Sequence, residues 1–331
     1  MHRIELRIDV SHAVPHAGRH EIAMTAWLPP AESMVLPRPV VIFASPGGGY
    51  TRHYYDIQAP GHEGYSQAEA HVRNGFIVIA YDHLGVGDSS TQHLCDYTVP
   101  HLAAANDAAV REVTARLLAG TLSEALPPLP GLVRIGIGQS MGGCLTIVMQ
   151  GRHATFDAIA PLGYSAIHTV LPQRDETDRQ RALQSHARIG SRALADISVE
   201  ESSREVVDFV YPFHWDDVPR DILDADMAGG YPLRETAPAW GSLTVPPCAV
   251  TMMTPGVVAA EAAAIKVPLL IAMGERDVCP DPHAEPSAYT GSKDVSLFVV
   301  PRMAHMHNFA STRALLWSRL GSWARRVAFQ A

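Results

Sequence analysis

Alternating and apolar segments recur along the chain and predict most of its secondary structure. Residues 3–10 and 21–28 alternate polar and apolar positions, a pattern typical of strands that bury one face. Six later segments are short and almost wholly apolar, as expected of strands covered on both faces. These segments are residues 39–45, 76–82, 132–139, 158–163, 267–274 and 295–300.

Helical segments separate these predicted strands. Helices are expected over residues 66–73, 102–119 and 309–327, together with one that begins directly after residue 140. A repeated order of strand, helix and strand predicts an α/β fold, in which helices cover both faces of a mostly parallel sheet. About eight strands are expected in that sheet.

The alternation stops between residues 165 and 264. That part of the chain is polar and helical over 175–195 and then carries aromatic clusters, after which the strand pattern resumes. We therefore interpret residues 1–164 and 265–331 as one core and residues 165–264 as an inserted helical lid.

Composition excludes several classes of protein. Of the 331 residues 47% are hydrophobic and 18% are charged, and the net charge is −8, which argues against nucleic acid as a partner. No apolar run approaches the length of a membrane span, and the amino-terminal segment lacks the apolar region of a signal peptide. The four cysteines are widely spaced. A reduced, cytoplasmic protein is expected.

The glycine-rich segment after the strand at 132–139 is the main candidate for chemistry. Gly138, Ser140 and Gly142 fit the pattern G-x-S-x-G, a turn that projects a serine hydroxyl beyond the end of a strand. Side chains at the two glycine positions would collide with the strained turn. The following helix would direct backbone N–H groups toward the serine oxygen.

With these features the sequence resembles the α/β-hydrolase-fold serine hydrolases over nearly the whole chain outside the predicted lid. In that family the nucleophile, the acid and the base follow one another along the chain, each at the end of a strand. The resemblance implies Ser140 as nucleophile, Asp277 as acid and His305 as base. An imidazole activates a serine hydroxyl, and a carboxylate orients the imidazole.

Each assignment has a rival. Glu275 and Asp281 lie close to Asp277 along the chain, although off the position of the family acid. His307 follows His305 by two residues and is the alternative base.

The resemblance also implies an oxyanion hole. Its first donor would be the N–H of Met141, and its second would come from the loop after the strand at 39–45. Gly48 fits the second position best and Gly49 next. The family often has His-Gly where this chain has Pro46 and Gly47, which leaves the second donor open.

We expect cleavage of a carboxylic ester or lactone through an acyl-enzyme, without cofactor or metal. The remaining histidines, including His12, His16 and His20, are interpreted as surface residues. Aromatic and methionine side chains suggest an apolar substrate group, or else they form the core of the lid. The candidate substrate-binding residues are Tyr50, Trp215, Trp240 and Met252.

Two other functions remain open at this point. The same triad also serves enzymes that act on C–C bonds, thioesters or acyl-transfer substrates. A small-molecule binding protein with little turnover is the third interpretation, which the complete triad disfavours. The sequence does not specify the substrate, and a homo-oligomer is compatible with the predicted edge strand and lid.

Overall fold

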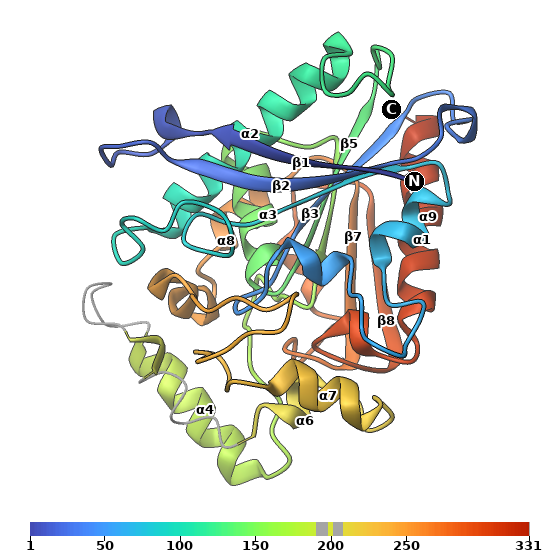
Figure 1. Ribbon diagram of the computed structural model, residues 1–331. Helices are drawn as coiled ribbons and strands as arrows, with labels where there is room; N and C mark the ends of the chain where they lie inside the picture. Colours follow the sequence, from blue (N-terminus) through green and yellow to red (C-terminus); the bar gives the residue numbers. More distant parts are fainter. Residues whose placement is uncertain (190–197, 201–207, 331) are drawn as a thin grey trace.

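In the computed structural model, the described chain forms one sheet of eight strands in the order β1-β2-β4-β3-β5-β6-β7-β8 (Figure 1). The structure describes residues 1–189, 198–200 and 208–330. β1 pairs antiparallel with β2 and β2 antiparallel with β4, whereas every later pair is parallel. The predicted fold class, a mostly parallel sheet flanked by helices, is confirmed.

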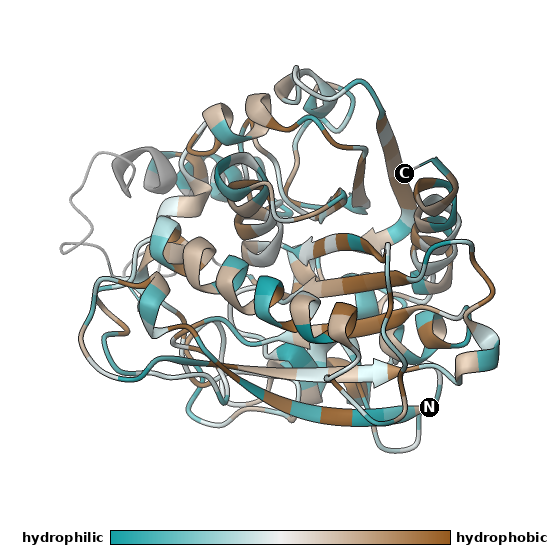
Figure 2. Cartoon of the chain, turned by 90° about the horizontal axis from the view of Figure 1, so that it is seen from above, coloured by the Kyte–Doolittle hydropathy of each residue, from teal (hydrophilic) through white to brown (hydrophobic). Residues whose placement is uncertain are grey.

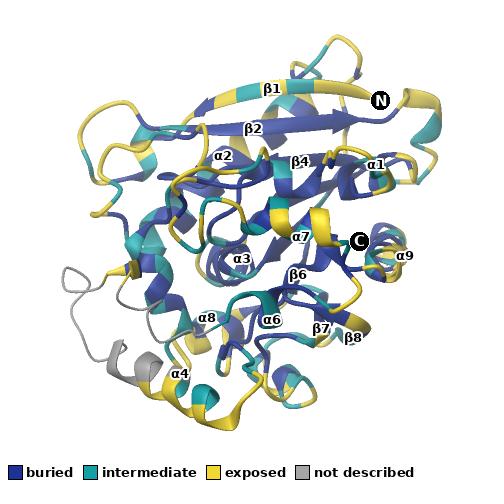
Figure 3. Cartoon of the chain, turned by 60° about the horizontal axis from the view of Figure 1, so that its bottom comes forward, coloured by how far each residue is buried: buried dark blue, intermediate teal, exposed yellow. Residues whose placement is uncertain are grey.

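The strands coincide closely with the apolar segments of the sequence. Central strands are buried along their whole length because helices cover both faces, whereas the edge strand β1 leaves alternate side chains exposed (Figure 3). The strands are β1 (His2–Asp9), β2 (Glu21–Leu28), β3 (Val40–Ser45), β4 (Ile77–Tyr81), β5 (Val133–Gln139), β6 (Ala158–Leu162), β7 (Leu269–Arg276) and β8 (Val295–Ala304).

Two helical layers enclose the sheet. α1 (Gln67–Val72) and α9 (Arg313–Gln330) cover one face, and α2 (Val99–Ala119), α3 (Met141–His153) and α8 (Ala259–Ala264) cover the other. Successive side chains of a strand enter opposite layers, so Phe43 belongs to one core and Ile42 to the other. Hydrophobic residues accordingly concentrate on the central strands (Figure 2).

Local signals explain where these helices begin and end. Ser66 and Thr98 accept hydrogen bonds from the first turns of α1 and α2. α2 begins three residues before the predicted helix, because Thr98 caps it and Pro100 fits its first turn. Gly120 ends the same helix with a φ of +70°.

The chain between β6 and β7 contributes no strand to the sheet among its described residues. Its helices α4 (Glu176–Ile189), α6 (Val210–Phe213) and α7 (Arg220–Met227) lie below the sheet in Figure 1, near the carboxyl ends of the parallel strands. The end of the helix predicted over 175–195 lies outside the described residues. α8 closes the segment and packs against α3.

No described helix is both long enough and apolar enough to cross a membrane.

Candidate active site

Ser140 occupies a strained turn between β5 and α3. Its φ of 54° and ψ of −118° lie outside the regions that ordinary residues favour. A Cβ atom at Gly138 would lie 2.1 Å from the Gly142 carbonyl oxygen, and one at Gly142 would lie 2.1 Å from the Ser45 carbonyl oxygen. The predicted need for glycine on both sides of Ser140 is therefore confirmed.

A chain of hydrogen bonds connects Ser140, His305 and Asp277. His305 Nε2 lies 2.9 Å from Ser140 Oγ, and His305 Nδ1 lies 2.6 Å from Asp277 Oδ1. Ser140, Asp277 and His305 directly follow β5, β7 and β8, respectively, so one edge of the sheet brings them together. The geometry allows the imidazole to accept the serine proton while the carboxylate holds its other nitrogen.

Asp277 is buried and fully hydrogen-bonded. Oδ1 accepts from the backbone N–H of Val278 and Oδ2 from that of Gly274, both at 2.8 Å. Burial by itself would raise the pKa of Asp277, but the charges and hydrogen bonds of His305 and His307 hold it well below its usual range. The carboxylate is therefore ionised at neutral pH.

The rival residues lie in other positions. Glu275 accepts a hydrogen bond from the backbone N–H of Arg302 on the surface, and Asp281 is exposed and caps the turn at His283. His307 Nε2 lies 2.7 Å from Asp277 Oδ2. Among the described residues, His305 is the histidine within hydrogen-bonding distance of the Ser140 hydroxyl.

The loop after β3 is held by its backbone carbonyl groups. All five carbonyl oxygens from residue 45 to residue 49 accept a hydrogen bond, which fixes the peptide planes and hence the directions of the N–H groups between them. The donors, in order, are the Tyr55 hydroxyl, His83 Nε2, the Tyr50 N–H, the Tyr231 hydroxyl and the Ser242 N–H.

The N–H groups of Met141 and Gly48 remain free for a ligand. Neither donates to another group in the part of the chain that the structure describes, and both residues line the pocket at Ser140. Gly49 is not among the described residues that line this pocket; its φ is +79°, and a Cβ there would lie 2.8 Å from the Tyr231 ring. Two fixed N–H groups beside a serine hydroxyl can stabilise an oxyanion.

His83 is a supporting residue that the sequence analysis missed. It lies two residues after the end of β4 and is fully buried, and burial lowers its pKa to about 4. Neutral His83 donates from Nε2 to the Pro46 carbonyl at 3.0 Å, while Asn106 bonds its Nδ1. Like Ser140 and His305, His83 comes after a buried strand. That position in the sequence is the signal by which it could have been found.

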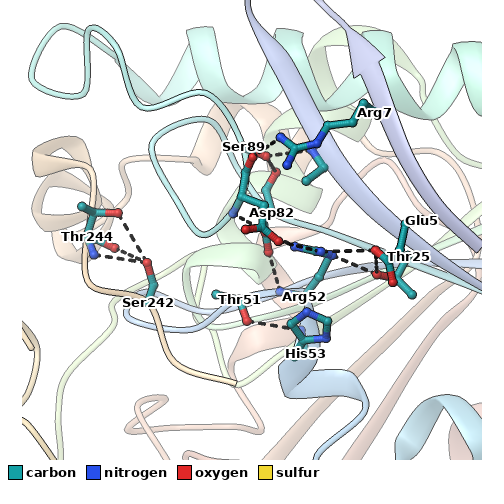
Figure 4. Close-up of polar contacts among 12 residues, drawn as sticks. Glu5, Arg7, Thr25, Thr51, Arg52, His53, Asp82, Ser89, Ser242 and Thr244 are labelled. Carbon is teal, nitrogen blue, oxygen red and sulfur yellow. Dashed lines mark hydrogen bonds and ion pairs between the residues drawn. The ribbon is translucent and has the colours of Figure 1, made fainter. Parts of the chain in front are cut away.

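Arg52 fixes the chain just beyond this loop (Figure 4). Its guanidinium pairs with the buried Asp82 at the end of β4 and with Asp88, the latter at 2.8 Å. Its backbone N–H also donates to Asp82 Oδ1 at 2.6 Å, and its Nε donates to Thr25. The chain after β3 is thereby tied to β4, the strand beside β3, and to β2 on the far side of β4.

An apolar pocket opens in front of Ser140. Apart from His305, its described lining carries no basic side chain, and it carries no acidic one. Most of the lining comes from the chain between β6 and β7, including Leu171, Phe209, Phe213, Tyr231, Val245, Val250, Met252 and Met253. The pocket suits a neutral, mostly apolar group.

Of the four candidate substrate-binding residues, Met252 lines this pocket. Tyr50 and Trp240 are buried instead and donate to the carboxylate of Asp226, each at 2.7 Å. Trp215 lies against the Arg276 guanidinium, 4.6 Å from ring centroid to Cζ. A sequence cannot distinguish such packing aromatics from pocket aromatics, because both are apolar rings with one polar atom.

Comparisons with known proteins agree with this architecture. The sequence profile of the Alpha/beta hydrolase family matches residues 41–316. No curated protein matches the chain in sequence.

Several solved structures share the fold at low sequence identity. A haloalkane dehalogenase loop variant from Bradyrhizobium elkanii superposes with a TM-score of 0.63 at 13% identity, covering 98% of this chain and 97% of its own. A soluble variant of monoglyceride lipase from Saccharomyces cerevisiae gives 0.62 at 15% identity, covering 94% of each chain. A thermophilic esterase from Thermogutta terrifontis gives 0.59 at 15% identity, covering 98% and 99%. At these identities the likeness concerns the fold alone.

Proposed function

The chain belongs to the alpha/beta hydrolase family, and on that premise we propose that it is a serine hydrolase. Its proposed reaction is hydrolysis of a carboxylic ester or lactone with a mostly apolar group, through an acyl-enzyme. The observation that carries the proposal is the continuous hydrogen-bonded chain from Ser140 through His305 to Asp277. Dehalogenases of this fold use an aspartate nucleophile, whereas this chain has Ser140 at that position.

The proposed first half-reaction forms the acyl-enzyme. Ser140 Oγ attacks the carbonyl carbon while His305 Nε2 accepts the hydroxyl proton, and Asp277 stabilises the resulting imidazolium. The N–H groups of Met141 and Gly48 bind the oxyanion of the tetrahedral intermediate. His305 then returns the proton to the leaving alkoxide, and the alcohol departs.

The second half-reaction reverses these roles with water as the nucleophile. His305 accepts a proton from water, which attacks the acyl carbonyl, and the same two N–H groups hold the second oxyanion. The proton then passes to Ser140 Oγ as the carboxylic acid leaves. Protein groups and water supply every atom and proton that these steps need.

The pocket supports the choice of substrate class. The described part of the wall is apolar and carries no carboxylate or ammonium group, which favours burial of a hydrocarbon acyl or alcohol group at about 25 cal/mol for each Å² removed from water. Because residues 165–264 supply most of that wall, we propose that this segment acts as a lid over Ser140.

Hydrolysis of p-nitrophenyl esters of increasing acyl length tests the proposal. We expect turnover by the unmodified chain, a loss of at least 10³-fold in Ser140→Ala, and unchanged turnover in the exposed control Ser287→Ala. A fluorophosphonate should modify Ser140, as located by mass spectrometry. Undiminished hydrolysis by Ser140→Ala refutes the nucleophile, and a folded chain that forms no adduct supports a binding protein instead.

A further inference from the structure

We propose that His16, His93 and Asp96 bind a divalent transition metal of the Zn²⁺ type. One ligand atom from each of the three side chains lies within 4.8 Å of the other two. His16 belongs to the connection between β1 and β2, and the other two belong to the segment before α2, both at the left of Figure 1. None of the three lines the pocket at Ser140.

The histidines form a cluster around His16. Its ring stacks on that of His93, with centroids 5.0 Å apart and planes inclined by 14°. The ring of His101 meets it edge-on at 5.4 Å, and that of His20 lies 6.5 Å away. Two chain segments far apart in the sequence thus bring four imidazoles together. The spacing of His12, His16 and His20 gave no sign of such a site, because its partners come from the second segment.

The backbone around the cluster is already ordered. The Tyr97 hydroxyl lies 2.8 Å from the Gln92 carbonyl oxygen and 2.9 Å from His20 Nδ1, which ties the two segments together. The side-chain amide of Gln92 also donates to the Arg19 carbonyl. A site whose supports are already in place loses little conformational entropy when it binds an ion.

One nitrogen in the cluster has no partner. His16 Nε2 is shielded from solvent and bonds to no group in the part of the chain that the structure describes. By contrast, both ring nitrogens of His20 face partners, Tyr97 and the Ala17 carbonyl. A shielded nitrogen lone pair without a partner is unfavourable, and coordination to a cation would satisfy it.

The distance between His93 and Asp96 fits a shared ion. His93 Nδ1 lies 3.3 Å from Asp96 Oδ2. Two ligands at about 2.0 Å from a tetrahedral Zn²⁺ are separated by about 3.3 Å. Both side chains are exposed and their backbones are joined by a turn, in which the Asp96 N–H donates to the His93 carbonyl at 2.9 Å. The His93 and Asp96 side chains can therefore coordinate an ion together, while His16 binds the same ion from the connection between β1 and β2.

His101 is available as a fourth ligand. Its Nδ1 faces the Thr98 N–H in the cap of α2 at 3.4 Å, so Nε2 is the ring nitrogen that it would offer to an ion. Imidazoles with one carboxylate are a donor set of Zn²⁺, whereas Mg²⁺ and Ca²⁺ prefer oxygen ligands.

Calorimetric titration of the chain, freed of any affinity tag and of metal, with ZnCl₂ at pH 7.5 tests the site. We expect one ion per chain with a Kd of about 10 µM or below. His16→Ala and His93→Asn should each weaken binding at least tenfold. Asparagine keeps the φ of +65° at position 93 accessible. The exposed His12→Ala is the matched control and should bind as the parent does, and MgCl₂ should give no binding.

A second measurement needs no variant. Co²⁺ in the site should give the visible absorption of a tetrahedral complex, which Zn²⁺ should displace. Zn²⁺ should also raise the Tm of the parent and of His12→Ala but not that of His93→Asn. The site is refuted if the parent binds no Zn²⁺, or if folded His16→Ala and His93→Asn bind it as tightly as the parent. Because none of these readouts uses hydrolysis, the result is independent of the function proposed for Ser140.

Discussion

His307 donates from Nε2 to Asp277 Oδ2 at 2.7 Å, the carboxylate oxygen that His305 does not contact. Asp277 therefore receives one imidazole on each oxygen. The other ring nitrogen of His307, Nδ1, is buried without a partner among the described residues. His307 acts on the proposed reaction through Asp277, as a positioning residue.

Replacing His307 by leucine should lower kcat/KM for an ester about tenfold and move the acid limb of its pH profile to higher pH. With one donor fewer, the Asp277 carboxylate is less stabilised by hydrogen bonds and interacts more strongly with the charged imidazolium of His305. The measurement is the pH dependence of p-nitrophenyl ester hydrolysis between pH 5 and 9.

Two further variants make this prediction specific. His307→Gln retains an N–H donor near the position of Nε2 and should restore most of the rate and the original acid limb. The exposed His283→Leu, in the chain after β7, should behave as the parent. An unchanged acid limb in a folded His307→Leu enzyme would contradict the positioning role. His307 would then serve only to pack the structure around Asp277.

Glycine replacements at positions 142 and 321 should have opposite effects on stability. A methyl group at position 142 would lie 2.1 Å from the backbone oxygen of Ser45, which cannot retreat without moving β3. Position 321 lies inside α9, where the nearest atom would be 3.7 Å away. Gly142→Ala should lose about 1–3 kcal/mol of unfolding free energy, and Gly321→Ala should gain about 0.5–1 kcal/mol.

Urea unfolding of both variants measures these differences. Gly142→Ala should also lose ester hydrolysis, since its added methyl group pushes the Ser140 turn and the loop after β3 apart. A Gly142→Ala enzyme with parental stability and activity would mean that the turn has room for a side chain.

The strands and the triad order could be predicted because each has a local signal. Segments 39–45 and 76–82 are apolar on both faces, and the structure has β3 and β4 there. Gly138, Ser140 and Gly142 mark the turn by spacing alone. Asp277 and His305 each follow a predicted strand, and parallel strands place their carboxyl ends at one edge.

The supports of the site could not be predicted, because they are contacts between distant segments. Nothing in the sequence near Tyr231 indicates that its hydroxyl donates to the Gly48 carbonyl. Tyr50 and Trp240 meet at the buried Asp226, although each has the composition of a pocket residue. Burial of Asp226 alone would raise its pKa, but His214 and then Arg234 hold it below the usual value. Such a partner set appears only once the chain is folded.

Replacing Tyr231 by phenylalanine tests whether the Gly48 carbonyl must be held. The Tyr231 hydroxyl lies 2.8 Å from that oxygen, and its removal leaves the peptide between Gly48 and Gly49 free to rotate. We expect kcat to fall about tenfold with little change in KM, corresponding to about 1.4 kcal/mol in the transition state. Equal losses of kcat in Tyr231→Phe and in the distant control Tyr65→Phe would contradict a specific role for the hydrogen bond to Gly48.

His71 should make the fold less stable in mild acid. This histidine of α1 is buried, and burial, followed by the charge of Arg325, lowers its pKa to about 4. An unfolded histidine titrates near 6.5. Between these two values the unfolded chain binds more protons than the folded chain, so stability is fully present above about pH 6.5 and decreases as the pH falls toward 4.

The size of the effect follows from the same shift. At 1.36 kcal/mol per pH unit, His71 should remove about 2 kcal/mol of unfolding free energy between pH 7.5 and 5.0. His83, with its pKa likewise lowered to about 4, acts in the same direction and remains in the variant. Urea unfolding at both pH values should therefore show that the loss of unfolding free energy is about 2 kcal/mol smaller in His71→Leu than in the parent. The exposed control His12→Leu should lose as much unfolding free energy between the two pH values as the parent does. An equally large loss in His71→Leu would show that His71 is not the titrating group.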